Sequence, residues 1–171
     1  MLIVKRLKEI RLCKIIMKNK TSHIVVKKEF QISKKYFNNI VLPAFSKIKA
    51  KMRPIKKNYS IAGKNICLYF YSKTLYEKIC LSLSHNEIKK TKKSDLTIYL
   101  WDTVSTGVHF SPFWKNYKKY TYDVNKKANT DGFFGVYFDK ERALNLYDEK
   151  NKVAHFWIYD ASEIPFWIVA A

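Results

Sequence analysis

Glycine, proline and cysteine are scarce in this chain, with four, four and three copies among 171 residues. No Gly/Ser-rich or Pro-rich linker is present, so no stretch of the sequence forces a division into several domains. The cysteines are odd in number and form no C-x-x-C pair, which argues against a disulfide framework and a structural zinc site. We therefore expect reduced, mostly buried thiols and a cytoplasmic protein. The three residues are Cys13, Cys67 and Cys80.

Long apolar runs are also missing. A membrane-spanning helix needs roughly 18 consecutive apolar residues, and no stretch of this chain approaches that length. Residues 1–20 interrupt every apolar patch with Lys or Arg and show no cleavable signal sequence. An amphipathic helix on a membrane surface stays open as an alternative for this segment, because its Leu and Ile residues can be gathered on one side.

Acidic residues are few, 14 against 33 Lys and Arg, which gives a formal net charge of +19. Residues 1–60 hold 17 of the basic residues and two Glu. Such a field attracts nucleic acid, anionic lipid or an acidic protein. Only four of the basic residues are Arg, the side chain that phosphate sites favour. The abundance of Lys, Asn, Ile, Tyr and Phe can also be explained by a gene rich in A and T, whose codons favour these residues. Charge alone therefore does not establish a nucleic-acid partner.

The change in composition near residue 60 divides the chain into a basic N-terminal segment, residues 1–60, and a domain formed by residues 61–171. Within the segment, Ser33 is a good helix start, but Pro43 should break or kink a continuous helix. We expect helix in this segment without assigning its bounds.

After residue 60 the hydrophobic patterns are clearer. Residues 65–72 and 96–102 alternate between two faces, as strands do. Residues 73–84 carry Leu or Ile at every fourth position, which predicts a helix lying on a sheet. Residues 108–130 are rich in Lys and aromatic side chains and contain Pro112, so we predict a surface loop.

Three further β-like runs, residues 132–139, 143–148 and 152–160, complete the pattern. The last two are joined by the polar tetrapeptide DEKN, which suits a hairpin turn and indicates an antiparallel meander. The order strand, helix, strand and then three strands predicts an α+β fold in a single domain. Its sheet is expected to be mainly antiparallel, with the helices on one side.

The candidate site is the stretch SDLTIYLWDTVSTGV, residues 94–108, where a predicted strand runs into a turn of small polar residues. A base and a hydroxyl nucleophile are conceivable among four residues of this stretch and its end, Asp102, Ser105, Thr106 and His109. The favoured interpretation is a self-capped strand end, because Asp, Ser and Thr bond to their own loop backbone and Gly107 supplies a positive φ. We expect Trp101 to be a packed anchor.

Other chemistries have weaker support. The P-loop pattern G-x-x-x-x-G-K-[ST] is absent; the Gly63-Lys64 pair lacks the earlier Gly and the following Ser or Thr. The four His residues show no tight ligand spacing, so we predict no metal site. Residues 113–127 interleave Lys with aromatic side chains, a composition suited either to binding single-stranded nucleic acid or to a solvated loop.

Two motifs, SDLTIYLWDTVSTGV and the later HFWIYDASEIPFW, resemble the N-terminal region of bacterial HPr-kinase-like proteins, which are related to HPr serine kinase. The resemblance covers roughly residues 60–171. It implies a motif or partner-binding surface at the matching positions, which are Trp101, Asp102, Ser105, Thr106, Gly107, Pro165 and Trp167.

In that family the N-terminal region leads into a P-loop domain that binds ATP and Mg²⁺ and is inferred to transfer a phosphoryl group. This chain has no Walker A motif, so the resemblance assigns it no catalytic residue and no cofactor of its own. We therefore expect a non-catalytic accessory or substrate-recognition domain, truncated or split from its kinase half. The alternative is a small basic nucleic-acid-binding protein.

Overall fold

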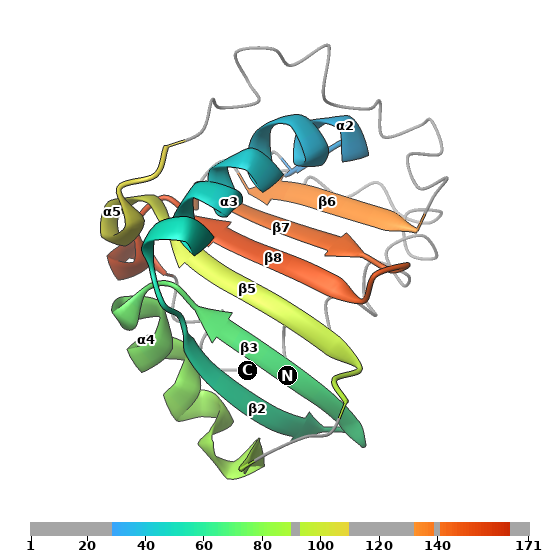
Figure 1. The fold of residues 1–171 in the computed structure, drawn as a ribbon, viewed down its shortest axis with the longest axis vertical. Coiled ribbons are helices and arrows are strands. Elements are labelled where there is room, and N and C mark those ends of the chain that lie inside the picture. Colours follow the sequence, from blue (N-terminus) through green and yellow to red (C-terminus); the bar gives the residue numbers. More distant parts are fainter. Residues whose placement is uncertain (1–28, 90–92, 110–131, 139–140, 165–171) are drawn as a thin grey trace, which may run out of the picture.

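The computed structural model describes residues 29–89, 93–109, 132–138 and 141–164, which form a single sheet with helices packed against it (Figure 1). The sheet has eight strands in the order β1-β6-β7-β8-β5-β3-β2-β4. Their bounds are β1 (Glu29–Gln31), β2 (Ile55–Ile61), β3 (Lys64–Phe70), β4 (Glu87–Ile88), β5 (Leu96–Asp102), β6 (Phe133–Phe138), β7 (Ala143–Asp148) and β8 (Val153–Ile158). The pairings of β3 with β5 and of β5 with β8 are parallel, and the others are antiparallel.

A helical segment of three successive parts, α2 (Lys34–Tyr36), η1 (Phe37–Val41) and α3 (Leu42–Lys51), crosses one face of the sheet. It begins at the predicted residue, because the Ser33 hydroxyl accepts a hydrogen bond from the Tyr36 N–H at 3.2 Å. Of the predicted break or kink at Pro43, the break does not occur, since the chain is helical on both sides of the proline. The turn η1 is π-helical, and this wider turn lies directly before the proline, which has no N–H and would crowd the preceding turn of a regular helix.

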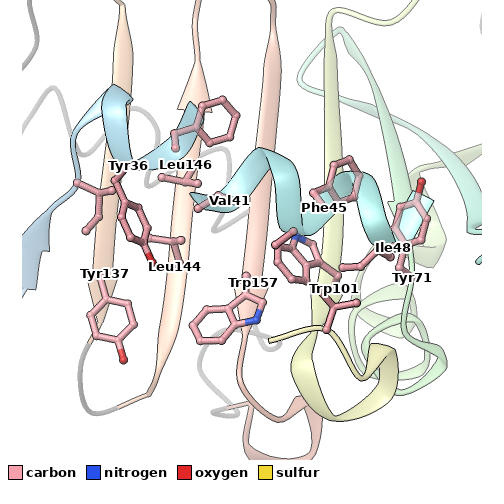
Figure 2. Close-up of a cluster of buried hydrophobic side chains, with 14 of the residues drawn as sticks. Tyr36, Val41, Phe45, Ile48, Tyr71, Trp101, Tyr137, Leu144, Leu146 and Trp157 are labelled. Atoms are coloured by element: carbon pink, nitrogen blue, oxygen red, sulfur yellow. The ribbon is translucent and has the colours of Figure 1, made fainter. Parts of the chain in front are cut away.

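The two faces of the sheet carry separate cores. Helix α3 covers one face, where its buried Phe45 and Ile48 belong to a cluster with Trp101 and Trp157. Figure 2 shows this cluster, with Val41, Phe45 and Ile48 of the helical segment lying over Tyr137, Leu144, Trp157, Trp101 and Tyr71 of the sheet side. Helix α4 (Lys73–Leu83) packs on the opposite face through Leu75 and Ile79, against a second cluster of aliphatic and aromatic strand residues.

The α+β class and the mainly antiparallel sheet are confirmed, and so is the meander β6-β7-β8. The expectation that the helices lie on one side is not met, because α3 and α4 cover opposite faces. The physical reason is visible in the central strands: five of the six residues of β8 are buried, so both of its faces need a cover.

The shift in composition near residue 60 does not coincide with a break in the sheet. Strand β2 runs from Ile55 to Ile61 and pairs along its length with β3, and β1 pairs with β6. Strands β1 and β2, which the basic N-terminal segment supplies wholly or largely, therefore belong to the same sheet as the strands that follow. Residues 1–28 and most of the predicted loop 108–130 lie outside the described residues. Among the helices of the described ranges, none is long and apolar enough to cross a membrane.

Gly135 in β6 lies directly against Ile32, the residue after β1, whose N–H donates to the Gly135 carbonyl at 2.8 Å. A Cβ at this position would be 2.9 Å from both the Ile32 carbonyl oxygen and Leu146 Cδ2. We predict that Gly135→Ala lowers the free energy of unfolding by about 1–3 kcal/mol, because the backbone must shift to admit one methyl group. Urea unfolding followed by tryptophan fluorescence measures this. Ser60→Ala at an exposed strand position serves as the control and should change stability by less than about 0.5 kcal/mol; equal midpoints for the two variants would contradict the prediction.

Candidate functional site

The two sequence motifs meet at one end of the sheet. They lie on β5 and β8, which are parallel neighbours with Trp101 opposite Trp157 and Asp102 opposite Ile158. The turn after β5 is held by the end of β8, because the backbone N–H groups of Thr103 and Val104 both donate to the Tyr159 carbonyl, at 3.1 and 3.2 Å. Two segments more than fifty residues apart therefore form one continuous surface at the carboxyl ends of these strands.

The turn itself, α5 (Thr103–Thr106), is self-capped as predicted. Asp102 Oδ1 accepts from the Ser105 N–H at 2.6 Å, which satisfies an N-terminal donor of the short helix. The Thr106 hydroxyl donates to the Asp102 carbonyl at 2.5 Å. Gly107 ends the helix with φ +64°, and its N–H donates to the Thr103 carbonyl at 2.9 Å. The polar groups of the motif are thus used to build the turn.

The remaining predicted residues fall in different environments. Trp101 is fully buried, and its ring centroid lies 6.2 Å from that of Phe45 and 6.4 Å from that of Trp157. It is a packed anchor, as expected. His109 is exposed, and within the described ranges no hydrogen bond joins it to Asp102 or Ser105. Pro165 and Trp167 lie outside the described residues.

Two buried hydroxyl side chains at this end of the sheet were missed by the sequence reasoning. Ser72, directly after β3, caps α4 by accepting from the Leu75 N–H at 3.2 Å, and its hydroxyl lies 3.1 Å from the Ser105 hydroxyl. Thr103 accepts from the Trp157 indole N–H at 3.0 Å. A serine before a helical pattern is an N-cap signal, so Ser72 could have been found; its pairing with Ser105 depends on the parallel register of β3 and β5.

The arrangement offers little for acid–base chemistry. Asp102 is fully buried; its Oδ1 holds the cap, and its Oδ2 has no hydrogen-bond partner in the described part of the chain. The exposed Ser105 hydroxyl contacts another serine hydroxyl instead of a base. Across the described ranges, no three His, Cys, Asp or Glu side chains gather in a way that could hold a metal ion.

A buried histidine lies further back on the same strand. His155 of β8 is 4% exposed, and rings of Phe37, Phe45 and Tyr99 surround it with centroids 5.3, 4.7 and 5.2 Å away. Burial, assisted by the positive charge of Lys49, lowers the pKa of His155 to about 4. The imidazole is therefore neutral at physiological pH and acts as a packing residue.

Comparisons of the chain with protein-family models, with curated proteins and with solved structures found no match. The relation to HPr-kinase-like proteins therefore stays a prediction that depends on the two motifs.

The capping role of Asp102 can be tested with two substitutions that differ in their ability to cap a helix. Asp102→Ala should lower the free energy of unfolding by about 1–2 kcal/mol, because it removes the acceptor for the Ser105 N–H. Asp102→Asn should retain most of the stability, since Asn caps helices as well as Asp does. Thermal and urea unfolding of both variants measure this; an Asn variant as unstable as the Ala variant would contradict the capping role.

His155 predicts a distinct acid sensitivity. The unfolded chain takes up a proton on this residue near pH 6.5, whereas the folded protein does so only near pH 4. Stability should therefore be full above pH 6.5 and fall toward pH 4, by at most about 1.4 kcal/mol per pH unit. In His155→Phe this part of the slope should vanish, as measured by urea unfolding across the pH range. Identical slopes for parent and variant would show that His155 does not cause the acid sensitivity.

Proposed function

We propose that this chain is a non-catalytic accessory or partner-recognition domain of the kind that begins HPr-kinase-like proteins. ATP and Mg²⁺ would be bound by a P-loop domain on the same or another polypeptide, and phosphoryl transfer would occur there. The observation that carries the proposal is the meeting of both motifs at one end of the sheet. A surface built jointly by two distant motifs is what a docking site requires.

The surface itself favours contact over chemistry. The three parallel strands β3, β5 and β8 end side by side here, the place where open sheets with parallel strands present their binding loops. The cap uses the polar groups of Asp102 and Thr106, and it leaves Val104 58% exposed beside the exposed Ser105. An exposed apolar residue on a rigid turn suits a protein or peptide partner.

A cytoplasmic location is part of this proposal. Cys67 and Cys80 are free thiols in the described part of the chain. Burial raises the pKa of the Cys80 thiol, which keeps it protonated and unreactive. Unpaired thiols in a folded domain are typical of reducing compartments.

The proposal predicts that docking depends on the turn. The first step is to translate the DNA adjoining this coding sequence in all frames and to search it for the pattern G-x-x-x-x-G-K-[ST]. The P-loop protein found in this way is purified, and its binding to the 171-residue chain is measured by isothermal titration calorimetry. Val104→Asp should weaken binding by about tenfold or more, because a charge replaces an apolar contact. Leu81→Asp is the matched control, since Leu81 is 81% exposed on α4 away from the turn.

Three results would overturn the proposal. The first is the absence of a P-loop frame in that DNA. The second is binding that Val104→Asp and Leu81→Asp weaken equally. The third is ATP hydrolysis by the purified chain alone that Asp102→Asn abolishes, because the chain would then be an enzyme with its reaction centre in the turn.

Nucleic-acid binding remains the second candidate function. The net charge of +19 favours it, and the structure adds a specific surface, away from the turn, on which such binding can be tested.

A further inference from the structure

A row of side chains crosses the α3 side of the sheet from its edge to its centre. Strand pairing places Lys56 of β2 opposite Tyr69 of β3, Tyr69 opposite Tyr99 of β5, and Tyr99 opposite His155 of β8. These four residues, which we call the tyrosine row, point to the same face because each is paired directly with the next. The row changes from buried imidazole at one end to exposed ammonium at the other.

Helix α3 covers only the inner end of the row. Its Phe45 ring lies 4.7 Å from His155 and 4.8 Å from Tyr99 between centroids. Tyr69 and Tyr99 are only partly buried, and their rings are 5.3 Å apart with 31° between their planes. In Figure 1, the helical segment runs from α2 over β6, past β7 and β8, to the end of α3 near β5, and β2 and β3 lie beyond that end. Among the described residues, no helix covers the outer half of the row, which is therefore a partly exposed aromatic surface.

Two ammonium groups lie against these rings. Lys56 Nζ is 5.5 Å from the Tyr69 centroid, and Lys49 Nζ, which comes from α3, is 5.9 Å from the Tyr99 centroid. Neither lysine forms an ion pair with a carboxylate within the described ranges. The next residue, Lys57, points to the other face and is paired with Glu87 at 2.6 Å. The free positive charge of this strand is thus on the side of the tyrosines.

We propose that the outer half of the tyrosine row binds single-stranded nucleic acid. A base would stack on Tyr69, and Lys49 and Lys56 would neutralise the adjoining phosphates. The combination of aromatic rings and cations on one surface favours this occupant, because stacking is available to every base and the phosphates supply the complementary charge. A duplex keeps its bases in the helix and cannot stack them on the rings.

The experiment uses the full 171-residue chain and fluorescein-labelled dT20 and rU20, with anisotropy titrations at several salt concentrations. Lys56→Ala should weaken binding and reduce the slope of log K against log salt by about 0.7, the value for one phosphate contact on a single strand. Lys57→Ala, which removes the same charge from the neighbouring residue on the opposite face, should leave that slope unchanged. This pair separates the surface from the general charge of the chain.

The stacking step is tested at Tyr69, which lies at the rim of the core. Tyr69→Leu should weaken binding by about 5- to 150-fold, the range that a lost stacking contact gives. Tyr69→Phe keeps the ring and should bind within about twofold of the parent, and thermal unfolding of each variant checks that it folds.

Three results would overturn the proposal. The first is an equal effect of Lys56→Ala and Lys57→Ala. The second is binding of a duplex of the same length as tight as that of the single strand. The third is that Tyr69→Leu retains full affinity for the single strand and that phosphatidylserine vesicles or poly-glutamate compete fully for the same lysines. The surface would then respond to negative charge alone.

Discussion

The parallel pairing of β5 with β8 is the contact on which the rest of the structure depends. It joins a front half, β2 to β5, to a meander, β6 to β8, and no short connection helps to bring the two strands together. It sets Trp101 beside Trp157 on one face and Leu100 beside Phe156 on the other. Each helix can bury its apolar side only because this pairing has already made a wide sheet, so both cores share one long-range constraint.

Most of the fold after residue 60 could be predicted, because its strands alternate and its helix repeats every fourth residue. The bounds of β5 and β7 match the predicted strands, and those of β6 and β8 differ by one or two residues. Strand β2 was missed because Lys and Asn interrupt its apolar pattern at a position near the sheet edge. The sequence does contain a signal for the second helix-covered face. Tyr99 and Trp101 make the face of β5 opposite Ile98 and Leu100 apolar as well.

The candidate site also has a part that the local sequence predicts and a part that depends on distant strand pairing. The cap at Asp102 could be predicted because its acceptor, its donor and Gly107 lie within six residues, so local rules determine it. The contacts with Tyr159, Trp157 and Ser72 could not, since each depends on the register of distant parallel strands. Lys56 and Tyr69 are likewise unremarkable in the sequence and become a surface only through strand pairing.

The outermost strands described, β1 and β4, have three and two residues. A sheet edge exposes unpaired N–H and C=O groups that can template another chain, and very short edge strands limit that hazard. In the described part of the chain, these two border strands therefore offer little backbone to a foreign strand. A partner that meets the protein on a face or at a turn instead contacts side chains.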